Sequence, residues 1–322
     1  MSTATLMPIP QNFKNSVDWI LGAYTDADVT FPNGFQKDAI QNCVGARKSL
    51  NNWNNWVCDI SLVENANGRF VIVEDSGTVG LTGRNIPGTE VNAMMAREET
   101  LPPEERLARF SSMFNSGGNA TGQGLFGAGK SVYSVASEEY TYYFDSLRED
   151  GKYVANMNER GQVYPLAFEG DAAKAFIFEK TGLSEKSTTG TRIIIKSPKA
   201  ELTDSITSGE IIPFIQESWW LIISRLGKGS RISVNGTPVT VPAGIKEGTH
   251  VYELPATEQY ASNYRVKHFG LYVFQQGGNI WDNWSMGIQG GGTMKMGDAA
   301  FFKSARPAFG LSVGKQWTPI LG

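Results

Sequence analysis

Residues 71–83 constrain the fold most, because an apolar run there ends in acidic residues that are followed at once by closely spaced glycines. The stretch reads VIVEDSGTVGLTG, with Asp75 ending the run and glycines at positions 77, 80 and 83. A carboxylate at the end of a strand can accept a hydrogen bond from an exocyclic amine such as N6 of adenine. A glycine two residues later lets a flat ring approach the backbone. Taken alone, the pattern is more typical of an ordinary glycine-rich turn.

Helical spacing covers residues 34–50, where Phe35, Ala39 and Cys43 recur on one face. Asp38 and Asn42 are four residues apart, so both side chains lie on one face of this helix. A side-chain amide oxygen is a ligand that suits Mg²⁺, and a carboxylate one turn away can orient or deprotonate a water molecule. The alternative for this pair is a solvated helix face.

A second glycine cluster, GQGLFGAGKS at residues 122–131, precedes a predicted helix. Free backbone N–H groups and a helix N-terminus both favour a phosphate. Gly124, Gly129, Lys130 and Ser131 also match the P-loop pattern, which would make the chain a P-loop NTPase. A P-loop directly follows a buried strand, however, and the preceding residues SMFNSGGNATGQ do not form a strand pattern.

Strand patterns at residues 56–63 and 69–74 flank an Asn/Gly turn and predict a hairpin. Further strands are expected at 140–147, 164–168 and 191–195, and the last of these begins with the Gly-Thr pair of TTGTRIII. The polar segment 82–122 contains a charged helical piece near residues 104–114 and has the length of a lid or binding loop.

In chain order, the Asp38–Asn42 pair, the Asp75 segment, the second glycine cluster and the Gly-Thr pair resemble the GHKL superfamily of ATPases, which includes heat-shock chaperones, MutL and MORC proteins. GLFGAGK is most similar to the chaperone and MORC versions, and the resemblance covers residues 34–195. It implies an α+β class: the Bergerat ATP-binding fold, a two-layer sandwich with helices on one face of a mixed sheet. Residues 82–122 would form a lid that closes over the nucleotide.

The resemblance also implies roles for individual residues in binding ATP and Mg²⁺. Asp38 falls on the general base, usually a glutamate, so its reach is one methylene shorter. Asn42 falls on the magnesium ligand, and Asp75 on the aspartate that reads the adenine. The segment from Asp75 to Gly80 carries one residue more than the family's D-x-G-x-G pattern. The other ATP-binding positions are Ala46, Gly77, Gly80, Gly124, Phe126, Gly127, Gly129, Lys130 and Thr191.

The composition of the chain excludes few classes of function. The net charge of −3 gives no bulk argument for nucleic-acid binding, although a local basic patch would still permit it. Two cysteines cannot build a disulfide framework. The N-terminus lacks a signal-peptide pattern and no run is long enough to span a membrane, so we expect a cytoplasmic protein.

The length of 322 residues suggests two domains. We expect an ATP-binding domain at 1–200 and a β-rich domain at 201–322, with an interdomain joint around residues 197–210. The second domain would resemble the transducer domain of GHKL ATPases. Lys295 and Lys315 are its candidates for reaching the γ-phosphate, although each is also typical of a surface lysine.

The sequence therefore predicts an ATPase with Mg²⁺-dependent hydrolysis, in which ATP controls lid closure and association with a second copy or a protein partner. A bacterial defence or DNA-processing system is one setting in which such modules occur. Two alternatives stay open. One is a nucleotide-gated interaction module with little hydrolysis, suggested by Asp38 in place of glutamate. The other is a P-loop NTPase that uses Lys130 and Ser131.

Overall fold

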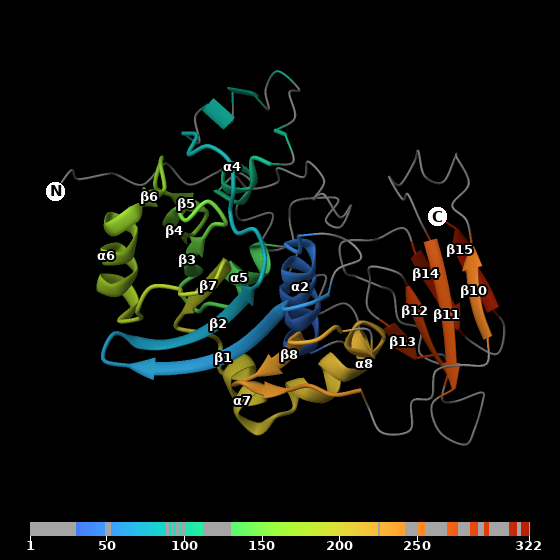
Figure 1. The fold of residues 1–322 in the computed structure, drawn as a ribbon. Coiled ribbons are helices and arrows are strands. Elements are labelled where there is room, and N and C mark those ends of the chain that lie inside the picture. The colour runs from blue at the N-terminus through green and yellow to red at the C-terminus, as the bar shows by residue number, and fades with distance from the viewer. Residues whose placement is uncertain are drawn as a thin grey trace.

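The computed structural model describes residues 30–48, 53–87, 90–91, 93–94, 97, 101–102, 104–111, 130–224, 226–241, 250–254, 269–275, 284–288, 293–295, 309–313 and 317–321. Helices and one large mixed sheet make up the described part of the N-terminal two thirds, which places the protein in the α+β class (Figure 1).

The nine-stranded sheet has the order β5-β4-β3-β7-β2-β1-β8-β9, with β6 paired to β4. The parallel pair is β1–β8, and the other pairs are antiparallel. The strands are β1 Val57–Asn65, β2 Gly68–Ser76, β3 Thr141–Leu147, β4 Tyr153–Glu159, β5 Gln162–Val163, β6 Phe168–Glu169, β7 Gly190–Lys196, β8 Arg231–Val234 and β9 Thr237–Pro238. The predicted hairpin is confirmed as β1 and β2, with Asn65 opposite Gly68 at the turn.

The helices are α2 Phe31–Gly45, α4 Arg106–Ser111, α5 Ser131–Val135, α6 Gly170–Thr181, α7 Ala200–Ser208 and α8 Ile211–Ser224. The main core lies between the sheet and α2, α5, α7 and α8; Val71 and Val73 of β2 and Ile193 of β7 point into it. The predicted helix at 34–50 is thus observed as α2, which begins earlier, with a proline in its first turn, and ends at Gly45.

The opposite face of the sheet is covered by α6, on the other side of β3 and β4 from α2 (Figure 1). Alternate residues of the same strands, such as Phe70 and Ile72, form a second core with Ala173, Phe176 and Ile177 of α6. The expectation of helices on one face only is therefore wrong. The central strands are apolar on both sides, and such strands need cover on both faces.

The large sheet also continues past residue 200. Strand β8 pairs with β1, and Leu202 and Ile206 of α7 are buried in the main core. The segment expected to be an interdomain joint is therefore largely the helix α7, and the boundary expected at 200–201 falls inside this packed unit. Further along, β10 His250–Leu254, β11 Phe269–Gln275, β12 Trp284–Ile288 and β13 Thr293–Lys295 form a four-stranded sheet, while β14 Phe309–Val313 pairs with β15 Trp317–Leu321.

The described parts of the predicted lid are packed rather than extended. Leu107 of α4 is buried in the main core, and its amide donates to the Thr82 carbonyl over 2.9 Å. The ring of Phe110 meets Phe144 of β3 edge-on, with 4.8 Å between centroids. Ile86, Val91, Leu101 and Ala108 form a small separate cluster. The helix expected near 104–114 is observed as α4, which lies against the main core.

Candidate nucleotide site

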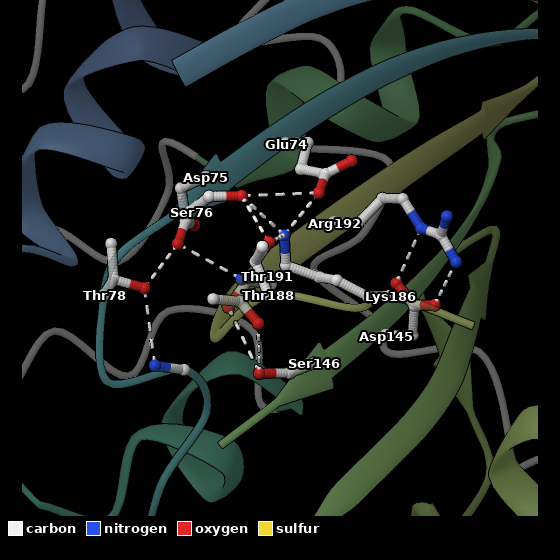
Figure 2. A network of polar contacts seen from close by, with 12 residues as sticks. Glu74, Asp75, Ser76, Thr78, Asp145, Ser146, Lys186, Thr188, Thr191 and Arg192 are labelled. Carbon is white, nitrogen blue, oxygen red and sulfur yellow. Dashed lines mark hydrogen bonds and ion pairs between the residues drawn. The ribbon is translucent and has the colours of Figure 1, made fainter. Parts of the chain in front are cut away.

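Strand alternation places the predicted site residues of the sheet on the face that α2 covers. Asp75 follows Val71 and Val73 at alternate positions of β2, and Thr191 precedes Ile193 in β7. Ser146 lies on the same face of β3, two residues after Phe144. These three side chains therefore meet at one end of the sheet, where Figure 2 shows them close together.

The carboxylate of Asp75 is buried, with 5% of the residue exposed. Its Oδ1 atom accepts two hydrogen bonds, from the Thr191 amide over 3.1 Å and from the Thr78 hydroxyl over 2.5 Å (Figure 2). Among the residues that the structure describes, none donates a hydrogen bond to Oδ2. One oxygen of this carboxylate is thus held by the protein, and the other has acceptor capacity left over.

Burial raises the pKa of Asp75 to about 6, because the charged form loses hydration. The hydrogen bond from Thr78, the positive charge of Lys186 and the Thr191 amide act in the opposite direction and lower this pKa. The group is consequently ionised at neutral pH, where it can only accept hydrogen bonds.

Gly77 and Gly80 have left-handed backbone conformations, with φ of +76° and +72°. A Cβ atom on Gly77 would stand 2.0 Å from the Asn55 carbonyl oxygen, and one on Gly80 would stand 2.7 Å from Ser146 Oγ. The amide of Gly77 donates to the Thr189 carbonyl over 2.9 Å. Within the described chain, these glycines let the loop after β2 pack closely against its own protein neighbours.

Gly190 brings β7 against Asp75. Its φ is +143°, and a Cβ atom there would lie 2.2 Å from the Asp75 carbonyl oxygen. The Ser146 hydroxyl donates to the Gly190 carbonyl over 2.8 Å and accepts from the Leu81 amide over 2.9 Å. Sequence reasoning missed Ser146. The alternation of Tyr142, Phe144 and Ser146 in β3 was the signal available for it.

Helix α2 carries the three predicted residues Asp38, Asn42 and Ala46 along its second half and end. Asp38 and Asn42 are partly buried, and the Asn42 side-chain amide donates to the Tyr133 hydroxyl of α5 over 3.0 Å. Ala46 caps the helix, and its carbonyl accepts from Arg106 of α4 over 3.2 Å. Arg106, another residue that sequence reasoning missed, thus joins the predicted lid to the end of α2.

Lys130 is buried and directed toward the end of α4. Its ammonium donates to the carbonyls of Arg109 and Phe110 over 2.6 and 3.1 Å, and burial lowers its pKa to about 7. The segment directly before Lys130, residues 112–129, lies outside the described residues, so the P-loop alternative stays a prediction. Gly124, Phe126, Gly127, Gly129 and Lys315 lie outside the described residues, whereas Lys295 ends β13.

A second polar network occupies the α6 face at the same end of the sheet. Lys186, whose side chain is fully buried, forms an ion pair with Glu74 and donates to Ser76 and Thr188 over 2.9 and 3.3 Å (Figure 2). Arg192 donates from Nε and Nη2 to the two oxygens of Asp145, over 3.0 and 2.5 Å. Strand alternation therefore separates this charged network from Asp75 and Thr191.

No group of three or more His, Cys, Asp or Glu side chains suited to a metal ion occurs in the described part of the chain. In that same part, no helix combines the length and apolar character needed to cross a bilayer. The sequence matches no protein-family model and has no significant match among curated proteins.

Proposed function

We propose that the protein binds ATP, with Oδ2 of Asp75 accepting a hydrogen bond from the exocyclic amine of the adenine. The observation that carries the proposal is the half-satisfied carboxylate: Oδ1 takes two protein donors, while Oδ2 takes none among the described residues. A buried carboxylate is costly unless its hydrogen-bonding capacity is used. An amine donor that reaches Oδ2 would use it.

The surroundings of Asp75 support a Bergerat-type arrangement. Asn42 and Asp38 lie one turn apart on α2, the helix packed over the sheet face that carries Asp75 and Thr191. Asn42 is also joined to Tyr133 in α5, the helix that follows the second glycine cluster. The proposed adenine-reading acid, the predicted metal ligand and helix α5 thus adjoin α2. The presence of α6 on the far face does not obstruct this arrangement.

Hydrolysis is the second part of the proposal. Asn42 would hold Mg²⁺ through its side-chain oxygen, and the ion would neutralise charge on the phosphates. Asp38 would orient a water molecule and accept its proton. Because Asp38 is shorter than glutamate, a nucleotide-gated module with little turnover is the competing function. The rate of phosphate release by wild type and Asp38→Ala separates the two, since equal rates at the buffer level would exclude the ATPase.

Binding is tested by calorimetry with a non-hydrolysable ATP analogue and Mg²⁺. We expect Asp75→Asn to lose about ten- to a hundred-fold in affinity, as for a lost hydrogen bond to a charged group. The matched control is Asp59→Asn, the same chemical change in β1, where the carboxylate accepts instead from Ser233 and Gly236. If Asp75→Asn binds as tightly as wild type, the proposed pocket is wrong, and the P-loop alternative would gain support.

Association is tested on the same samples by measuring the molecular mass with and without the analogue. An ATP-gated dimer would double in mass when the analogue and Mg²⁺ are added, and Asp75→Asn would stay at its starting mass. A mass that does not change with nucleotide would remove self-association from the proposal.

A further inference from the structure

Thr78 contacts the proposed base-reading carboxylate more closely than any other described side chain. It is fully buried in the loop after β2, and its hydroxyl donates to Asp75 Oδ1 over 2.5 Å. The same hydroxyl oxygen accepts from the Gly80 amide over 3.4 Å. The loop is one residue longer than the D-x-G-x-G pattern that Asp75 and Gly77 resemble, and Thr78 lies within it.

The two donors to Oδ1 approach from different elements. Thr78 comes from the loop after β2, and the Thr191 amide comes from the start of β7. A carboxylate whose one oxygen is bound from two elements cannot rotate about its last side-chain bond without losing one of those bonds. The two hydrogen bonds to Oδ1 therefore also fix the direction in which Oδ2 points.

We propose that Thr78 is a positioning residue for nucleotide recognition: its hydroxyl holds Oδ1 of Asp75, so that Oδ2 is the oxygen presented to the amine of the base. This inference rests on the proposed function, because it assigns Oδ2 to the adenine. It adds a residue that the GHKL resemblance does not include, and it explains how the longer loop still supports a base-reading aspartate.

Thr78 also acts on the charge of Asp75. A hydrogen bond to the ionised form favours that form, so the Thr78 hydroxyl opposes the effect of burial. Other charged or titratable groups also lie near Asp75. They are the thiols of Cys43 in α2 and Cys58 in β1, the guanidinium of Arg106 in α4, and the ion pair of Lys186 and Glu74 on the far face of the sheet. Each of these remains in place when Thr78 alone is changed.

The test compares Thr78→Val, which replaces the hydroxyl with a methyl group of similar size, and Thr78→Ser, which keeps the hydroxyl. Affinity for the non-hydrolysable ATP analogue is measured with Mg²⁺ from pH 5.5 to 9. We expect Thr78→Val to bind about tenfold more weakly at pH 7. Its affinity should recover partly toward pH 9, because the pKa of Asp75 rises without the donor. Thr78→Ser should follow the wild-type profile.

A second measurement does not depend on the nucleotide. The carboxyl ¹³C shift of Asp75 in the free protein, assigned with Asp75→Asn, gives its pKa in each variant. A higher pKa in Thr78→Val than in Thr78→Ser supports the proposal, and equal values overturn it. If wild type does not bind the analogue, the proposed function fails, while this comparison still decides whether Thr78 governs the carboxylate. Should Thr78→Val not fold, Thr78→Ala replaces it in the same comparison.

Discussion

Asn42 of α2 and Tyr133 of α5 are joined by a 3.0 Å hydrogen bond from the side-chain amide to the phenol oxygen. The residues are 91 positions apart, and Tyr133 is almost fully buried, with 2% of the residue exposed. Because the amide nitrogen is directed at Tyr133, the amide oxygen is the atom of Asn42 that remains for a ligand. The contact links the predicted magnesium ligand to the helix that follows the glycine cluster.

We expect Tyr133→Phe to lower the free energy of unfolding by about 1 kcal/mol, the net worth of one internal hydrogen bond. It should also weaken Mn²⁺ binding, used as a magnetic-resonance probe for Mg²⁺, in the presence of the ATP analogue. The control is Tyr142→Phe, because Tyr142 packs against Tyr133 with 5.7 Å between ring centroids, while its hydroxyl makes no hydrogen bond to another described residue. Equal Mn²⁺ affinity in wild type and Tyr133→Phe would show that this contact does not position Asn42.

The pKa of Asp75 predicts how stability depends on pH. Burial raises this pKa to about 6, whereas an unfolded aspartate has a pKa of about 4. Between these values the native state binds more protons than the unfolded state, so this group lowers the free energy of unfolding as pH rises from 4 to 6. Well above pH 6, Asp75 is ionised in both states, and a further rise in pH no longer changes its contribution to the free energy of unfolding. Keeping Asp75 ionised at neutral pH is therefore a cost to folding.

Asp75→Asn should accordingly raise the free energy of unfolding at pH 7, by at most about 3 kcal/mol, and should remove this part of the pH dependence. The asparagine oxygen can still accept from Thr78 and Thr191, so the hydrogen bonds that the structure shows are retained. Urea denaturation at half-unit steps from pH 4 to 8 measures both effects. A variant less stable than wild type at pH 7 would mean that the carboxylate serves the fold rather than a ligand.

The sequence predicted the local elements and several site residues because their signals are local. The hairpin of β1 and β2 follows from two strand patterns around an Asn/Gly turn, and α2 follows from apolar spacing. Asp75, Asn42 and Thr191 were singled out by motif order, and the structure brings Asp75 and Thr191 into contact. The Asn42 amide meets Tyr133, a contact that no pattern within one segment could indicate.

Other features could not be predicted because they depend on which elements meet in space. Thr78 and Ser146 are ordinary polar residues until β2, β3 and β7 align and bring them to Asp75 and Gly190. The cover of the second face by α6 depends on side chains such as Phe176, which local patterning did not assign to either face. The polar stretch before α8 suggested a joint, yet burial of Leu202 and Ile206 makes most of it the helix α7.

Gly77 tests how strongly the site depends on close backbone contact. We expect Gly77→Ala to cost more than 2 kcal/mol in free energy of unfolding, because its Cβ would stand 2.0 Å from the Asn55 carbonyl oxygen. Gly151→Ala is a matched control, since its φ of +78° is close to the +76° of Gly77 and a Cβ there meets nothing within 4 Å. That control should lose only about 1 kcal/mol of conformational strain. Similar losses in the two variants would contradict the close contact.

Arg192 and Lys196 lie four residues apart on β7, and each forms an ion pair. The pair of Arg192 with Asp145 is buried, whereas the pair of Lys196 with Glu139 is exposed. Arg192→Met leaves the fully buried Asp145 without its cation and should cost about 3–5 kcal/mol in free energy of unfolding. Lys196→Met removes the exposed partner of Glu139 and should cost at most about 1 kcal/mol. Adding Asp145→Asn to Arg192→Met should restore most of the loss, because the unpaired buried charge is then gone. If the double variant is no more stable than Arg192→Met in urea denaturation, the loss comes from packing of the arginine stem and not from the buried charge of Asp145.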